Sequence, residues 1–233
     1  LGPRSPGSIL TLLYKQAINE NIFNFRKIEV ADYINKLEDC CNKNTVQIIK
    51  SSEVKKILTQ NNSVTGVQLH NGENFESTCI ISNADPKTTY LDLLGAEILD
   101  TDFIRRTKNF RNKGNVAKLE LVLENDVTIN NIDKDMYGKF IYAPNIKYIE
   151  HAFNANKYNK YSENPCLEFY VNQNTISANV YYVPYLLNSN HKENEIIKRC
   201  VSVLSQFIPE MKIAKEKLIT PNQMAEKYNI AGG

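Results

Sequence analysis

The stretch that decides the fold runs from Glu53 to Pro86. It reads E-V-K-K-I-L at residues 53–58, V-T-G-V-Q-L-H-N-G-E at residues 64–73 and C-I-I-S-N-A-D-P at residues 79–86. Apolar residues in the first two segments recur with the short period of a half-buried β-strand. Asn61-Asn62 supplies one turn, and Asn71-Gly72 is the preferred tight hairpin turn because both residues tolerate positive φ. The stretch therefore predicts a three-stranded antiparallel meander.

The end of the stretch predicts a change of environment. Cys79, Ile80 and Ile81 are consecutive apolar residues, which is typical of a strand buried on both faces in a parallel sheet. Asn83-Ala84-Asp85-Pro86 ends this strand. Pro86 suits the first turn of a helix that we expect to reach about Leu94.

The remaining chain alternates between helical and strand-like spacing. Helices are predicted at about 8–18, 31–41, 101–110, 144–157 and 190–207, and from 221 onward. Strands are predicted at 46–49, 116–123, 167–171 and 177–183, with a polar loop at 126–138. The order predicts an α/β protein of the mixed α+β kind.

Composition excludes several classes of function. The 233 residues are 42% apolar and 23% charged with a net charge of +2, and the basic residues are scattered, so we expect no nucleic-acid partner. No stretch approaches the roughly 18 consecutive apolar residues of a transmembrane helix. The five cysteines show no C-x-x-C spacing, which predicts free thiols in a reducing compartment such as the cytoplasm.

The sequence contains no recognisable phosphate-binding loop, metal-binding motif or catalytic-nucleophile motif. Its nine glycines form neither G-x-G-x-x-G nor a Walker-type loop, the backbone arrangements that bring N–H groups close to phosphates. No two of the three histidines are spaced i, i+4, so no metal site is predicted. A cluster of aromatic residues on or beside the predicted strands could line an apolar pocket or pack in the core of the sheet. We favour packing in the core because aromatic residues are common in strands. The members of the cluster are Phe169, Tyr170, Tyr181, Tyr182 and Tyr185.

The pattern V-T-G-V-Q-L-H-N-G followed by N-A-D-P resembles the phytoene desaturase-like FAD oxidoreductases. This family includes the carotenoid desaturases and relatives named for a pyridine nucleotide-disulphide oxidoreductase domain. Ser5-Pro6-Gly7-Ser8 is similar to the family's segment before the meander, and Thr220-Pro221 with residues 228–233 is similar to its later return segment. The family's Gly-Gly pair is replaced by Arg26-Lys27-Ile28-Glu29.

The resemblance implies an FAD cofactor and a division of the chain. Residues 30–86 would belong to an FAD/NAD(P)-binding domain, and residues 1–29 and 87–218 to a mixed-sheet substrate domain, with 219–233 returning to the FAD domain. Val54 would lie near the adenine of FAD, and Asn83, Ala84, Asp85 and Pro86 beside the cofactor. The substrate would be a small apolar molecule. The resemblance assigns no catalytic side chain.

Two functions stay open from the sequence. The first is the central fragment of an FAD-dependent oxidoreductase, inactive without cofactor-binding segments on the same polypeptide or on a partner chain. The second is a non-catalytic remnant or binding module derived from such an enzyme. In either case the apolar edge at Ile80-Ile81 predicts self-association or a partner chain.

Overall fold

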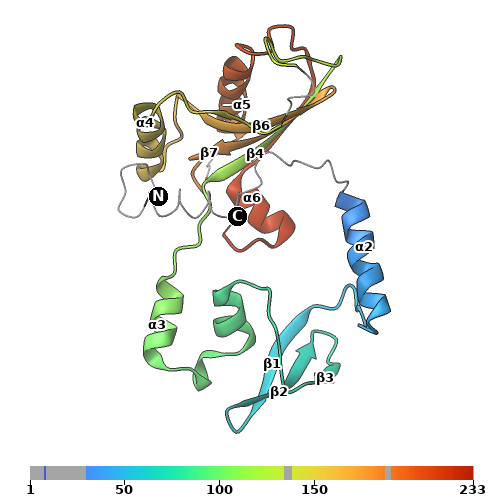
Figure 1. Cartoon of the computed structure of the whole chain (residues 1–233). Coiled ribbons are helices and arrows are strands. Elements are labelled where there is room, and N and C mark those ends of the chain that lie inside the picture. Colours follow the sequence, from blue (N-terminus) through green and yellow to red (C-terminus); the bar gives the residue numbers. More distant parts are fainter. Residues whose placement is uncertain (1–7, 9–29, 134–137, 187–189, 233) are drawn as a thin grey trace. The chain divides into compact units, whose positions relative to one another are not determined.

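The structure is a computed structural model, and it describes residue 8 and residues 30–133, 138–186 and 190–232. It has the expected mixed α+β fold, with one three-stranded and one five-stranded antiparallel sheet (Figure 1). The predicted helix at 8–18 and the substituted stretch at 26–29 lie outside the described residues, apart from Ser8. Every helix in the described ranges is too short or too polar to cross a bilayer.

The chain divides into two compact units, which are described separately below: residues 30–111 and residues 112–232. The first unit contains α2 (Val30–Lys43), β1 (Val54–Gln60), β2 (Ser63–Leu69), β3 (Asn74–Glu76), the π-helix η1 (Thr88–Leu93), the 3-10 helix η2 (Ala96–Ile98) and α3 (Thr101–Asn109). The second contains β4 (Val116–Leu123), β5 (Phe140–Tyr142), α4 (Ile146–Lys157), β6 (Cys166–Asn172), β7 (Thr175–Tyr181), α5 (Asn190–Leu204), β8 (Ile213–Ile219) and α6 (Pro221–Tyr228).

The meander forms as predicted, with strand order β1-β2-β3, and Asn61-Asn62 supplies its first turn, but the second turn differs from the expectation. Asn61 and Asn62 both have positive φ, at 52° and 61°, so the two-positive-φ turn joins β1 to β2. In the second hairpin Gly72 takes positive φ but Asn71 does not. The Gly72 N–H donates to Leu69 O and the Leu69 N–H to Glu73 O, which makes a longer turn closed by a left-handed glycine.

Gly66 of the V-T-G-V segment is required by the close approach of β3. A Cβ atom built on Gly66 would lie 2.2 Å from the carbonyl oxygen of Phe75. The backbone of β3 can therefore pair with β2 only where position 66 has no side chain. Both glycines of the motif thus have a structural reason within the meander itself.

Two predicted strands are absent. Residues 46–49 have no strand pairing, and residues 79–82 follow β3 as an extended segment outside the sheet. The Ser77 side chain closes a turn here, since its hydroxyl donates to Cys79 O and accepts from Cys79 N–H. Ile81 is 94% exposed, so the prediction of a strand buried on both faces is wrong for the described residues.

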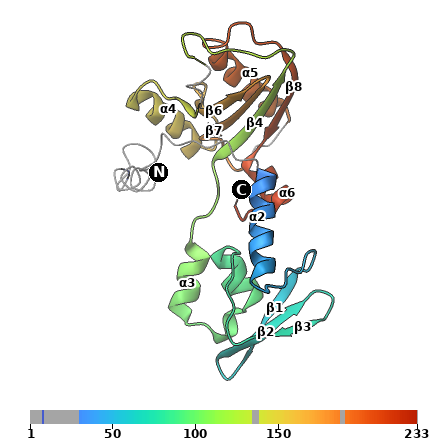
Figure 2. The ribbon, with the colours of Figure 1, turned by 45° about the vertical axis from the view of Figure 1, so that its right-hand side comes forward.

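The five-stranded sheet contains the main core. Its strand order is β5-β6-β7-β4-β8. Alternate residues of β4 are buried, from Ala117 to Leu123, and Leu167, Ile176 and Val180 lie on the same face. The apolar stripe of α5 covers this face and includes Ile196, Cys200 and Leu204, each fully buried (Figure 2). Each such Leu or Ile side chain contributes about 2 kcal/mol relative to exposure.

The sequence prediction missed the two edge strands of this sheet. β5 has only three residues, and β8 reads I-A-K-E-K-L-I, in which three charged residues interrupt the apolar pattern. Lysines on an edge strand keep it from pairing with other chains. Strands of this kind lack the apolar alternation on which the prediction relied.

The boundary between the two compact units differs from the segment boundaries that the resemblance implies. Contacts separate the units between Arg111 and Asn112, whereas the resemblance divided the chain after Pro86 and again after Leu218. Grouping by contact does not test which ligand a segment holds. The assignment of the four segments to cofactor and substrate domains stays a prediction.

The cysteine thiols of residues 30–111 should react faster than the buried thiols of residues 112–232. Burial raises the pKa of Cys166 to about 11 and that of Cys200 to about 12, from an ordinary value of 9.0. Cys40 and Cys79 are exposed and Cys41 is half-buried. At pH 8 we expect an aromatic disulfide reagent to titrate these last three thiols in the native protein and all five in denaturant. Cys79→Ser should remove one native thiol. Rapid native labelling of Cys200 would contradict the described core.

Adding a side chain at position 66 should open the second hairpin. Gly66→Ala places a methyl group against Phe75 O, and we expect a loss of about 1–3 kcal/mol of stability in the meander. Hydrogen exchange of the Leu69 and Ser77 amides measures the change. Thr65→Ala, at the exposed neighbouring position on β2, is the control. Equal protection in Gly66→Ala and wild type would refute the account.

Candidate functional site

The Asn83–Pro86 turn begins a helix and satisfies that helix's own first amides. One carboxylate oxygen of Asp85 accepts from the backbone N–H of Lys87 at 2.9 Å and of Thr88 at 3.4 Å. Pro86 has no N–H to offer. The N-terminal donors that a helix presents to a phosphate are therefore occupied by Asp85.

These contacts also lower the pKa of Asp85. Burial by itself raises the pKa, but hydrogen bonds from the Thr88 side chain and from the backbone N–H groups of Lys87 and Thr88 favour the ionised carboxylate. The charge of Lys87 acts in the same direction. The net result is a pKa below the ordinary value of 3.8, so the cap is ionised at neutral pH.

A closed ring of hydrogen bonds holds the turn against the helix. The Ala84 N–H donates to Ser82 Oγ at 3.3 Å, and Thr89 Oγ1 donates to Ala84 O at 3.2 Å. The two hydroxyl oxygens lie 2.8 Å apart. Either hydroxyl can donate in the contact between the two oxygens. The ring therefore uses at least one of the two hydroxyl protons internally.

A pocket of about 330 Å³ lies beside this ring, within residues 57–94. Its lining combines the ring with apolar side chains: Ile57, Val64, Ile80, Ser82, Ala84, Pro86, Thr89, Tyr90 and Leu94. β1, β2 and η1 position these residues. The pocket offers apolar contact together with the hydroxyl groups of Ser82 and Thr89. This chemistry suits part of a flat ring system and does not suit a diphosphate.

The structure brings two of the five predicted cofactor residues into this pocket. Ala84 and Pro86 line it, and Asp85 lies between them as the helix cap. Asn83 is exposed, and Val54 starts β1 opposite Leu69, away from the pocket lining. Contact of any of the five with a cofactor stays a prediction.

Several lining residues were missed by the sequence analysis. Thr89 and Tyr90 lie on the helix after the turn, one helical turn beyond Pro86, and this spacing is the signal that could have identified them. Ile57 and Val64 lie on strands whose facing is set by register. Register depends on turn geometry, and the turns were not all predicted correctly.

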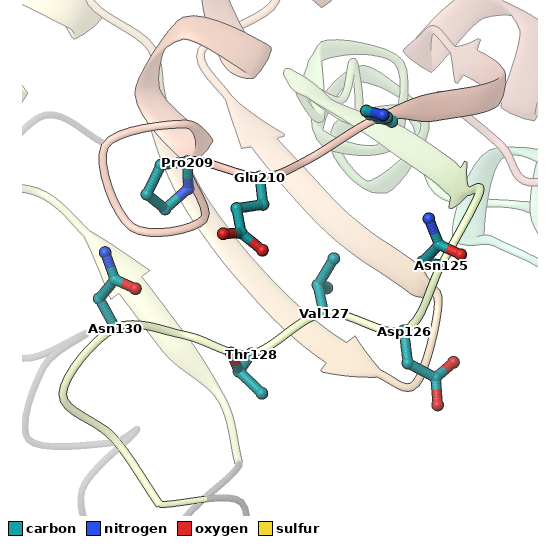
Figure 3. A pocket seen from close by; sticks show the side chains of 8 residues that line it. Asn125, Asp126, Val127, Thr128, Asn130, Pro209 and Glu210 are labelled. Atoms are coloured by element: carbon teal, nitrogen blue, oxygen red, sulfur yellow. The ribbon is translucent and has the colours of Figure 1, made fainter.

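A larger hollow of about 520 Å³ lies in the unit of residues 112–232, between the loop after β4 and the segment joining α5 to β8. Its polar lining consists of Asn125, Asp126, Thr128, Asn130, Glu210 and Lys212. Figure 3 shows the carboxylates of Asp126 and Glu210 pointing apart. These polar side chains are exposed. The hollow has the character of a solvated loop surface.

The open face of the five-stranded sheet carries a connected polar network. Glu168 accepts from Asn179 at 3.3 Å and from the Tyr181 hydroxyl at 3.1 Å. Asn179 in turn accepts from Lys118 at 3.4 Å, and Lys118 lies 3.7 Å from Glu120. Burial, followed by the charge of Glu168, raises the pKa of Tyr181 to about 12. The network stabilises the sheet's exposed face.

The aromatic cluster considered from the sequence does not form one pocket wall. Phe169 is 3% exposed in the core and stacks on Phe140, with ring centroids 5.4 Å apart. Tyr170, the next residue in the strand, points to the opposite face and is 37% exposed.

The described residues also contain no group of three or more His, Cys, Asp or Glu able to hold a metal ion.

Comparisons with known proteins give only distant similarity. No protein-family model matches the chain, and no curated protein matches it. Among solved structures, the chain is similar to the PF1083 protein from Pyrococcus furiosus, with 18% identity, a TM-score of 0.45 and coverage of 79% of this chain and 41% of that one. It is also similar to an oxidoreductase from Methanosarcina mazei, with 14% identity, a TM-score of 0.46 and coverage of 81% and 42%. The chain thus spans about two fifths of these structures, and TM-scores this low do not establish a common fold.

Removing the cap at Asp85 should loosen the turn. We expect Asp85→Ala to cost about 1 kcal/mol at pH 7, the usual value of an N-cap. Because the native pKa lies below the unfolded value of 3.8, this contribution is complete above that pH and is lost as the pH falls through the native pKa. Hydrogen exchange of residues 86–94, compared at pH values above and below 3.8, measures it.

The exposed Asp92 on the same helix provides the matched control. Asp92→Ala should change stability by less than about 0.5 kcal/mol. If the two variants exchange alike at pH 7, Asp85 does not act as a cap.

Proposed function

We propose that this chain is the central part of an FAD-dependent oxidoreductase that acts on a small apolar molecule. The observation that carries the proposal is the pocket beside the Asn83–Pro86 turn, which has apolar walls and includes Ala84 and Pro86. The meander and N-A-D-P pattern that resembles the phytoene desaturase-like family leads directly into this pocket. The resemblance and the pocket chemistry therefore point to the same few residues.

The residues present fit one part of FAD and do not fit the other. The pocket of about 330 Å³ suits an apolar portion of a ring system, in contact with Ala84 and Pro86. The capped amides of Lys87 and Thr88 leave no donors at this helix N-terminus for a diphosphate. A glycine-rich segment outside these 233 residues would hold the diphosphate, on the same polypeptide or on a partner chain.

The division of work in such an enzyme follows from this fit. When bound, the flavin supplies the capacity to accept a hydride from the substrate. This chain's residues 30–111 would form an apolar contact surface for the cofactor. We assign no catalytic side chain, and the location in the cytoplasm stays a prediction.

The unit of residues 30–111 exposes apolar residues that would be covered if this unit were one layer of a larger cofactor-binding domain. Only Ile57 and Leu69 are buried hydrophobic residues in it. On α2, Tyr33, Ile34 and Leu37 are 54%, 49% and 49% exposed. Exposed apolar area of this kind marks a surface for further packing, and it supports either a covering segment or self-association through residues 79–82.

Flavin absorbance tests the proposal. The chain co-expressed with flanking or partner segments that carry a glycine-rich loop should purify yellow with stoichiometric FAD. Ala84→Phe fills the pocket and should weaken FAD retention about tenfold or more, because a ring cannot share the space. Thr78→Phe, an exposed position outside the pocket lining, is the control.

A colourless complex after flavin soaking would refute the oxidoreductase assignment and favour the non-catalytic binding module. FAD retention unaffected by Ala84→Phe would refute the pocket as the contact site while leaving the enzyme class intact.

A further inference from the structure

Two hollows lie side by side along α5, and Arg199 belongs to the lining of both. Their volumes are about 310 Å³ and 210 Å³, and Glu163 is their other shared residue. Five α5 residues line them: Lys192, Glu195, Arg199, Ser202 and Val203. Their spacing places them along one side of the helix over about 16 Å. Because the two hollows share Arg199 and Glu163, we treat them as one groove along α5.

Arg199 is held in a fixed orientation between the two hollows. It forms an i, i+4 ion pair with Glu195 on the same helix. Its guanidinium carbon lies 4.5 Å from the ring centroid of Tyr161, a cation–π contact. Only 26% of the Arg199 side chain is exposed. The Arg199 side chain is therefore already ordered where the two hollows adjoin, so a ligand there would lose little side-chain entropy.

The larger hollow has an unbalanced positive charge. Glu195 is neutralised by Arg199, which leaves Lys160, Lys192 and Glu163 among the charged lining residues. Neither lysine has a carboxylate within ion-pair distance in the part of the chain that the structure describes. The remaining charge is that of one cation. It matches a monoanion such as a carboxylate better than a dianionic phosphate.

The smaller hollow offers an aromatic and apolar wall. Tyr142 and Tyr148 line it, with ring centroids 5.7 Å apart at an angle of 87°. The Tyr148 hydroxyl donates to Pro165 O at 3.1 Å, which fixes that ring. Val203 adds an aliphatic contact, and Gln206 also lines the hollow.

We propose that this groove binds an elongated organic carboxylate. The carboxylate lies at Lys160 and Lys192, and the apolar body extends past the Arg199–Glu195 pair toward Tyr142 and Tyr148. All of the named lining residues lie within 142–186 and 192–206, and the site is independent of the flavin proposal. No residue of the pocket beside Asn83–Pro86 takes part.

Isothermal titration calorimetry with four probes tests the proposal: acetate, 4-phenylbutyrate, 4-phenylbutyramide and inorganic phosphate. We expect 4-phenylbutyrate to bind about tenfold or more tightly than acetate, because its ring reaches the second hollow. The neutral amide should bind at least several-fold more weakly than the acid. Phosphate should bind more weakly than 4-phenylbutyrate.

Three variants separate the two parts of the groove. Lys192→Ala should weaken 4-phenylbutyrate about three- to fivefold, whereas Lys198→Ala, on the same helix but outside the lining, should leave it unchanged. Gln206→Trp fills the smaller hollow and should abolish the advantage of 4-phenylbutyrate over acetate. Circular dichroism verifies that each variant is folded.

Four results would overturn the proposal. They are the absence of carboxylate binding, equal binding of the acid and the amide, phosphate binding as tight as that of 4-phenylbutyrate, and equal weakening by Lys192→Ala and Lys198→Ala.

Discussion

The contact between the Asp85 carboxylate and the amides of Lys87 and Thr88 determines what the Asn83–Pro86 turn can do. It begins a helix, and with the Ser82–Thr89 hydroxyl pair it fixes that helix against the turn. The same contact uses up the donors that would otherwise bind an anion. The pocket beside the turn therefore combines apolar walls with the Ser82 and Thr89 hydroxyls, and the Lys87 and Thr88 amides are already paired with Asp85.

The two compact units differ in how they are stabilised. Residues 112–232 bury a continuous core, in which Leu119, Ile176 and Leu204 are among the fully buried side chains. Residues 30–111 rely on hairpin hydrogen bonds, the Asp85 cap and the close approach at Gly66, and their α2 helix has no buried residue. A unit that exposes this much apolar surface gains stability from whatever covers it. This difference supports a role for residues 30–111 as one layer of a larger domain.

The sequence predicted the elements that carry a strong local signal. Asn71-Gly72 and the alternation around it were enough for the meander, and apolar spacing was enough for α2, α4 and α5. It failed where the outcome depends on neighbours in space. β5 and β8 pair only because β6 and β4 present free edges, and Ile80-Ile81 has strand-like composition without a partner strand in the described residues. For the site, the N-A-D-P pattern located the turn. The Asp85 cap and the Ser82–Thr89 hydroxyl pair depend on side-chain geometry, which the spacing of residues along the sequence does not reveal.

The most direct measurement of the central claim is an amide chemical-shift titration of the 233-residue chain with pyrophosphate. A helix N-terminus already capped by its own carboxylate should show no saturable shift of the Lys87 and Thr88 amides at neutral pH. Saturable shifts at those two amides, with the Asp85 contact displaced, would contradict the account, because the turn would then bind the very group that we place elsewhere.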